Sequence, residues 1–281
     1  MINSKSLFST LFRKAFGGAK DMPPPILPRV PEKTCIYAIG DIHGRLDLLK
    51  AIHEKISEDA KDLSSEARKI IIYLGDYMDR GLHSKKVLDL LIESPLVEFE
   101  TIHLKGNHEQ KMLDFLDDSK FGKRWLNLGG GATIYSYGVR VPNDVHATKR
   151  YDHIQEELKK HVPEAHLKFL KGLRTSYISG DYLFAHAGID PAKSLDKQLD
   201  HDFIWSNPSF LKTTENFSKI IVHGHTIGTQ PVIKPNRICI DTGAYLSGAL
   251  TCLVLKDKSV RFLSTGQEEL QVYVSDDEYE E

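Results

Sequence analysis

Apolar residues between positions 34 and 104 recur with two alternating spacings, one typical of buried strands and the other of amphipathic helices. Short apolar runs predict strands, and the stretches between them, with apolar residues three and four positions apart, predict helices. The predicted elements, in order, are strand 35–39, helix 46–60, strand 69–74, helix 84–92 and strand 101–104. This order predicts parallel strands joined by right-handed crossovers.

The pattern changes in the second half of the chain. Residues 110–175 are predicted to be mostly helical, with a break at the glycines of 129–131. Closely spaced strand-like runs follow, and they predict a second, more antiparallel sheet. These runs cover residues 182–186, 219–223, 237–240, 250–255 and 259–263. The expected fold class is therefore α/β with two sheets.

The two ends differ from the segment between them. Residues 1–33 are basic and amphipathic: apolar residues would share one face of a helix over 6–16, and a proline run at 23–25 follows. Such a helix suits peripheral contact with a membrane or a partner protein, and the alternatives are a frayed tail or a helix packed on its own domain. Residues 271–281 are acidic and predicted to be solvated. Residues 34–270 are assigned to one domain.

Composition narrows the class of protein. With 281 residues, 41% hydrophobic and 27% charged, the chain suits a globular domain with a sizeable core. The net charge of −2 gives no general attraction to nucleic acid, so no nucleic-acid partner is expected. Cys35, Cys239 and Cys252 are too few for a disulfide framework, which predicts a reducing, cytoplasmic location. No segment approaches the ~20 continuous apolar residues of a membrane span.

Three glycine-bounded motifs follow the three early strands: GDIHG at 40–44, GDYMDRG at 75–81 and GNHE at 106–109. Open α/β sheets bind ligands at the carboxyl ends of their strands, so these motifs are expected to meet there. Their carboxylate, imidazole and amide groups suit divalent Mn, Fe or Zn. His186 and His225, which follow later apolar runs, are candidates for a second metal site. Two metals that share a carboxylate can activate water for displacement at phosphorus.

All fixed positions of the three motifs match GDxHG, GDxxDRG and GNHE, the signatures of the phosphoprotein phosphatase family of calcineurin-like metallophosphoesterases. The chain resembles that family over residues 34–256, most closely its bacterial and phage branch. The resemblance implies two mixed β-sheets packed as a sandwich and flanked by helices, which is a four-layer fold. It also implies that residues 34–270 are a catalytic domain.

The resemblance further implies which residues hold two divalent metal ions, with manganese expected and iron or zinc as alternatives. The first metal would be held by Asp41, His43 and Asp76, and the second by Asp76, Asn107, His186 and His225. A hydroxide that bridges the metals would attack phosphorus directly, without a phosphoenzyme intermediate.

The remaining motif residues would act on the substrate. His108, oriented by Asp79, would protonate the leaving alkoxide as general acid. Arg80 would bind phosphate oxygens, and Asn107 would contribute to the same site. Arg45 opens a predicted helix near the expected phosphate, so it is a further candidate for substrate binding; the alternative is a salt bridge at the helix end.

One part of the family pattern is missing. Many members carry a second phosphate-binding Arg between the last two histidine motifs, but residues 189–224 contain none. The basic alternatives there are Lys193, Lys197, Lys212 and Lys219. His223 alternates with His225 and is therefore a candidate for supporting the metal ligands, while Trp205 is predicted to be a core residue.

The function implied by the resemblance is hydrolysis of phosphomonoesters on Ser or Thr of proteins. The alternative is hydrolysis of dinucleoside polyphosphates such as diadenosine tetraphosphate. A third possibility is a non-catalytic scaffold that keeps an inactive metal site. The complete ligand set and the presence of His108 argue against this possibility. The expected partner is thus a phosphorylated protein or a small phosphoester.

Overall fold

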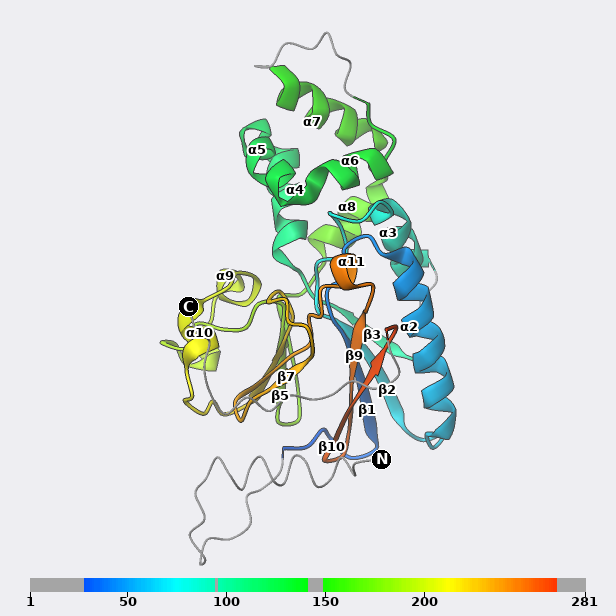
Figure 1. Ribbon diagram of the computed structural model, residues 1–281, viewed down its shortest axis with the longest axis vertical. Coiled ribbons are helices and arrows are strands. Elements are labelled where there is room, and N and C mark those ends of the chain that lie inside the picture. Colours follow the sequence, from blue (N-terminus) through cyan, green and yellow to red (C-terminus); the bar gives the residue numbers. More distant parts are fainter. Residues whose placement is uncertain (1–27, 94–95, 141–148, 267–281) are drawn as a thin grey trace, which may run out of the picture.

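The computed structural model describes residues 28–93, 96–140 and 149–266. The predicted basic helix over 6–16 and the acidic tail 271–281 lie outside these residues. Two β-sheets face each other, helices lie on their outer sides, and a further group of helices covers one end (Figure 1). Each sheet has five strands.

The first sheet has the strand order β10-β9-β1-β2-β3. β1 (Thr34–Ile39), β2 (Arg68–Tyr73) and β3 (Glu100–His103) are parallel. They are connected by α2 (Leu46–Asp59), which continues into the 3-10 turn Ala60–Asp62, and by α3 (Ser84–Glu93). The predicted order of strands and helices over this half is confirmed.

Two strands lie in a different sheet from the one predicted. β9 (Thr251–Lys256) and β10 (Ser259–Ser264) extend the first sheet, with β9 antiparallel to β1 and β10 antiparallel to β9. The prediction that they belong to the second sheet is wrong. Because Thr251–Leu255 are buried on both faces of the strand, their apolar run carries no alternation that would indicate a partner.

The second sheet has the strand order β4-β5-β6-β8-β7. Its central strands β5 (Tyr182–Ala185), β6 (Ile220–His223) and β8 (Arg237–Cys239) are parallel. Only the edge strands β4 (Ser176–Ser179) and β7 (Val232–Ile233) are antiparallel, and neither was predicted. The expected antiparallel character is therefore limited to the edges, and the class of two mixed sheets is confirmed.

Alternating side chains of β1 divide the interior into two cores. Tyr37 and Ile39 pack with the apolar faces of α2 and α3, whereas Ile36 and Ala38 point to the other sheet. The outer face of the second sheet packs against α9 (Asp200–Ile204) and α10 (Pro208–Lys212). Complete burial of each such side chain contributes about 1.5–3 kcal/mol. The result is the expected order of four layers: helix, sheet, sheet, helix.

The segment predicted to be helical contains short helices that cover one end of the sheets (Figure 1). They are α4 (Asn107–Asp117), the 3-10 turn Ser119–Phe121, α5 (Gly122–Trp125), the π-helical turn η3 (Leu126–Gly130), α6 (Gly131–Ser136), α7 (Arg150–His161) and α8 (Glu164–Lys171). A 3-10 turn at Leu195–Lys197 and α11 (Ala244–Ser247) complete the described helices.

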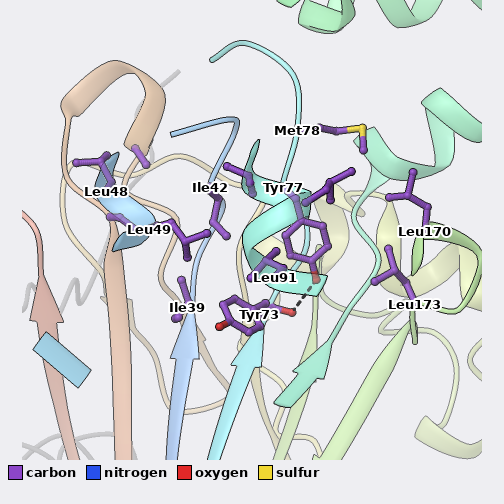
Figure 2. Close-up of a cluster of buried hydrophobic side chains, with 14 of the residues drawn as sticks. Ile39, Ile42, Leu48, Leu49, Tyr73, Tyr77, Met78, Leu91, Leu170 and Leu173 are labelled. Atoms are coloured by element: carbon purple, nitrogen blue, oxygen red, sulfur yellow. Dashed lines mark hydrogen bonds between the residues drawn. The ribbon is translucent and has the colours of Figure 1, made fainter. Parts of the chain in front are cut away.

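The loops of the first two motifs rest on an apolar cluster at the ends of β1 and β2. Figure 2 shows Tyr73, Tyr77 and Met78 in this cluster beside Leu170 and Leu173, which come from α8 and the residues after it. The loops therefore start from a packed base. In the described part of the chain, every helix is too short or too polar to span a membrane.

Candidate metal centre and active site

The ends of five strands bring the motif loops together. The three glycine-bounded motifs follow β1, β2 and β3, and the two later histidine motifs follow β5 and β6 of the facing sheet. The backbone N–H of His43 donates to the carbonyl of Asp76 (2.8 Å). The backbone N–H of His225 donates to the carboxylate of Asp41 (3.1 Å), which joins the two sheets at the site.

Backbone strain is concentrated in these loops. His43, Asp76, Asp79, Arg80 and His225 have φ values between 46° and 69°, and they are five of the seven described non-glycine residues with positive φ. Side chains disfavour this left-handed conformation, which costs about 1–3 kcal/mol per residue and persists only where surrounding contacts enforce it. Such clustering is typical of functional sites.

Glu109 provides part of that enforcement. Its buried carboxylate accepts hydrogen bonds from the backbone N–H groups of Asp76 (2.9 Å), Tyr77 (2.8 Å) and Gly106 (2.8 Å). The Glu109 side chain thus fixes the start of the second motif loop against the third motif loop. The sequence marked Glu109 only as a motif position, and this role becomes visible only in the structure.

Two groups of metal-donor atoms share the Asp76 carboxylate. One contains His43, Asp76 and His108, the other contains Asp76, His186 and His225, and within each group the donor atoms lie within 4.8 Å of one another. Asp76 Oδ2 is 3.6 Å from His43 Nε2 and 3.4 Å from His186 Nε2. A carboxylate shared by two donor groups is an arrangement that suits a two-metal site.

Asn107 belongs to the second group by its position. Its Oδ1 lies 3.0 Å from His186 Nε2, which is also 3.0 Å from His225 Nδ1. Divalent ions bind nitrogen and oxygen at about 2.0–2.2 Å, so neighbouring ligands of one ion are separated by about 3 Å. The spacing of these atoms therefore fits a metal ion.

Hydrogen bonds set the tautomers that metal binding needs. His43 Nδ1 faces the carbonyl of Met78 (2.8 Å) and His186 Nδ1 faces the carbonyl of Leu74 (3.0 Å), so both must donate through Nδ1. Each Nε2 then keeps its lone pair for a metal. Burial lowers the pKa of His43 to about 3 and that of His186 to about 4, which keeps both rings neutral.

Three buried carboxylates gather at the centre. Burial and the charges of Asp241 and Asp76 raise the pKa of Asp41, and burial together with the Asp76 charge raises the pKa of Asp241 to about 6. Buried carboxylates this close together need cations to remain ionised, so the donor set fits divalent metals. Asp41 lies outside both donor groups, and its role as a ligand stays a prediction.

His108 and Asp79 form a buried pair beside the donor groups. His108 Nδ1 lies 2.7 Å from Asp79 Oδ2, which leaves Nε2 directed at the site, 3.8 Å from Asp76 Oδ2. Burial would lower the pKa of His108, but the Asp76 charge and the hydrogen bond to Asp79 outweigh it and raise the pKa to about 9. The imidazole can therefore carry a proton at neutral pH, as a general acid must.

Two arginines come from the motif loops, but their surroundings differ. The guanidinium carbon of Arg80 lies 4.6 Å from the ring centroid of Tyr245, and that ring is 5.3 Å from the ring of His43. Arg80 is thus held beside the donors. Arg45 is bound to Asp47 (2.6 Å) and donates to the carbonyl of Ala244 (2.9 Å), which matches the alternative of a salt bridge at the helix end. Its role in substrate binding stays a prediction.

Of the four lysines named as alternatives to the second phosphate-binding Arg, two are already held by other partners. Lys193 is paired with Asp202 (2.7 Å), and Lys219 donates to the carbonyl of Gly180 (2.7 Å). Trp205 is half-buried and packs against the apolar cluster of α9 and α10, and the ammonium of Lys111 lies 4.6 Å from its ring centroid.

His223 belongs to neither donor group. It is fully buried, its ring packs edge-on against Phe210 (5.2 Å), and its Nδ1 lies 3.0 Å from the carbonyl of Gly224. Asp241 and Tyr245 were not singled out by sequence reasoning. An acidic residue after the strand-like run 237–240 and before Gly243 repeats the strand-to-glycine pattern of the three motifs, and that signal could have identified Asp241.

Comparison with known proteins agrees with this geometry. The family described as calcineurin-like phosphoesterase matches residues 36–258, and the chain belongs to this family. It is therefore a phosphoric ester hydrolase, and members of the family use divalent metals.

The similar proteins carry two different activities in their names. Serine/threonine-protein phosphatase 2 of Salmonella typhimurium is 28% identical over 232 residues, covering 79% of this chain and 93% of that protein. The bis(5'-nucleosyl)-tetraphosphatase PrpE of Halalkalibacterium halodurans is 27% identical over 234 residues, covering 76% and 87%. These similarities support the phosphatase class and leave both candidate substrates open.

Solved structures with this fold are more distant in sequence. A protein provisionally assigned as a diadenosine tetraphosphatase aligns with a TM-score of 0.56 at 16% identity, covering 87% of this chain and all of that one. A cold-active protein-tyrosine phosphatase from a Shewanella species aligns with a TM-score of 0.50 at 20% identity, covering 86% and 84%. At these identities the similarity concerns the fold alone.

Proposed function

We propose that this chain is a metal-dependent phosphoprotein phosphatase that hydrolyses phosphomonoesters of Ser and Thr. The observation that carries the proposal is the buried Asp79–His108 pair beside the donor groups, with Nδ1 and Oδ2 2.7 Å apart. Two divalent ions, with manganese expected, would supply a water nucleophile of lowered pKa and neutralise charge on the phosphoryl group.

The side chains of the chain itself account for the rest of the reaction. Arg80 has a planar fork of donors suited to two phosphate oxygens, which would hold the phosphoryl group toward the donor groups. His108 would donate the proton on Nε2 to the leaving oxygen. A serine or threonine alkoxide is a poor leaving group, so this proton transfer contributes strongly, typically about 10²–10⁴-fold.

The alternative substrate is a dinucleoside polyphosphate, and the similarity to PrpE supports it. Its leaving group is a nucleotide phosphate, which departs without a proton from a general acid, so a complete Asp79–His108 pair would be of less use. This difference in leaving group favours the phosphoprotein.

Steady-state kinetics can decide between the two substrates. With manganese present, we expect a higher kcat/KM for a phosphoserine or phosphothreonine peptide than for diadenosine tetraphosphate. A clear preference for the dinucleotide would reject the proposal in favour of the alternative. Failure to hydrolyse either substrate or p-nitrophenyl phosphate would instead support an inactive scaffold.

A further inference from the structure

The helical segment from α5 through η3 to α6 packs directly on the second motif. Its middle turn, η3, is kinked at Gly129, whose φ of 105° is not helical. The carbonyl of Gly129 accepts a hydrogen bond from the backbone N–H of Arg80 (3.2 Å), so this irregular turn is in contact with a site residue.

Two side chains of the same segment bind the Asp79 carboxylate. Trp125 Nε1 donates to Oδ2 (2.9 Å), the oxygen that also faces His108. The hydroxyl of Thr133 donates to Oδ1 (2.6 Å) and accepts from the backbone N–H of Asp79 (3.0 Å). Asp79, Trp125 and Thr133 are all fully buried. The hydroxyl of Thr133 also lies 2.9 Å from Ser84 Oγ.

These contacts determine how Asp79 can act on His108. A carboxylate with donors on both oxygens cannot rotate without breaking a charge-assisted hydrogen bond, and each such bond is worth about 1.5–3 kcal/mol. Loss of the Thr133 hydroxyl would leave Oδ1 with no other side-chain donor among the described residues. The carboxylate would then turn, and His108 Nε2 would turn with it, away from the leaving oxygen.

We propose that Thr133 and Trp125 are positioning residues: they hold Asp79 so that His108 presents its proton to the leaving group. The inference rests on the general-acid role of His108 proposed above. It extends the active site to a segment 46 to 54 residues beyond Asp79 in the sequence.

The test uses two small substrates that differ in leaving group, p-nitrophenyl phosphate and phenyl phosphate, so it does not depend on the natural substrate. p-Nitrophenolate is the better leaving group and needs less protonation. We expect Thr133→Val to lower kcat on phenyl phosphate by roughly 10- to 100-fold and on p-nitrophenyl phosphate by a much smaller factor. Thr133→Ser, which keeps the hydroxyl, should restore the turnover of phenyl phosphate.

Two further variants separate a specific effect from a loss of packing. Thr34→Val removes another buried hydroxyl, one that donates only to the carbonyl of Glu32 (3.3 Å) at the opposite end of β1, and it should leave both rates unchanged. Trp125→Phe keeps an aromatic ring against Phe115 but removes Nε1, so it should reproduce the selective loss of Thr133→Val even where the latter folds poorly.

The outcomes distinguish the inference from the proposed function. Suppose first that His108→Asn lowers the turnover of phenyl phosphate selectively. The inference is then overturned if Thr133→Val and Trp125→Phe reduce the turnover of both substrates equally, or reduce neither. If His108→Asn itself reduces both rates equally, the general-acid role fails, and the positioning role fails with it.

Discussion

At the scale of single residues, His108 occupies two roles that an experiment can separate. Its Nε2 lies near enough to Asp76 and His43 to count as a metal donor, while its Nδ1 is bound to Asp79 as in a general acid. We expect His108→Asn to lower kcat on a phosphopeptide by about 10²–10⁴-fold and to leave the metal content unchanged. Metal analysis of the purified variant, with His225→Asn as the variant expected to lose metal, would show which role is correct.

Two histidines outside the donor groups, His53 and His103, affect the stability of the fold. Burial lowers the pKa of His53 to about 4, and burial with the charge of His53 lowers the pKa of His103 to about 4. Both residues lie against Tyr73: His53 through a hydrogen bond to its hydroxyl (2.8 Å), and His103 by stacking with the ring centroids 4.8 Å apart.

The sign of the pH effect follows from these lowered pKa values. An unfolded histidine has a pKa near ~6.5, so below that pH the unfolded chain binds more protons than the folded one, and stability falls as the pH decreases toward 4. His103→Phe keeps a stacked ring and removes one titrating group, whose Nε2 has no partner among the described residues. We expect urea unfolding to show a smaller loss of stability between pH 7 and pH 5 in this variant than in the original chain. An equal loss in both would contradict the interpretation.

At the scale of elements, the kinked turn η3 lies against Arg80, whose backbone N–H donates to the carbonyl of Gly129 (3.2 Å). Gly129 has a φ of 105°, and a Cβ there would lie 2.8 Å from Arg80 Cγ. We expect Gly129→Ala to displace Arg80 and to lower kcat/KM for phosphoesters. Loss of a charge-assisted hydrogen bond of about 1.5–3 kcal/mol corresponds to roughly 10- to 100-fold.

Gly131 offers a matched control for that substitution. It has a helical φ of −57°, and a Cβ there would meet no atom within 4 Å. Gly131→Ala should therefore keep the original kinetics and raise the free energy of unfolding by about 0.5–1 kcal/mol. Indistinguishable kinetic constants for the two variants would show that Arg80 does not depend on the turn.

The meeting of the first motifs could be predicted from sequence because the strands before them are adjacent and parallel. Asp41, His43 and Asp76 follow adjacent parallel strands, and parallel strands end at the same edge of a sheet. The roles of Trp125 and Thr133 could not be predicted in this way. Their contact with Asp79 depends on how helices far along the chain fold back on the loop of the second motif. Only tertiary packing determines that arrangement.

The dependence on long-range packing also explains why β9 and β10 were predicted in the wrong sheet. β9 is buried on both faces, so its residues fit the centre of either sheet. Its pairing with β1 places Ile39 opposite Cys252, a contact between residues more than 200 positions apart. Hydrophobic pattern predicts that a strand exists, but the choice of partner requires the long-range contacts.

At the scale of the whole molecule, we expect the N-terminal segment to be dispensable for catalysis. The described chain is anchored from Arg29 onward: the backbone N–H of Arg29 donates to Asp181 (2.9 Å), and that of buried Val30 donates to the carbonyl of Asp257 (3.1 Å). These contacts lie at the start of β1, and the donor groups lie beyond its other end. A deletion should therefore stop at residue 27.

We expect removal of residues 1–27 to leave kcat and KM unchanged and to abolish binding to anionic vesicles in a co-sedimentation assay. The expectation rests on the sequence of that segment, since residues 6–16 would place Leu7, Leu11 and Phe12 on one face with Arg13 and Lys14 nearby. Each basic residue near an anionic surface contributes about 1 kcal/mol. In the full chain, Phe12→Asp should weaken vesicle binding as the deletion does, because it places a charge on the apolar face. Unchanged sedimentation of both proteins would reject membrane contact and leave a partner protein or a packed tail as the explanation.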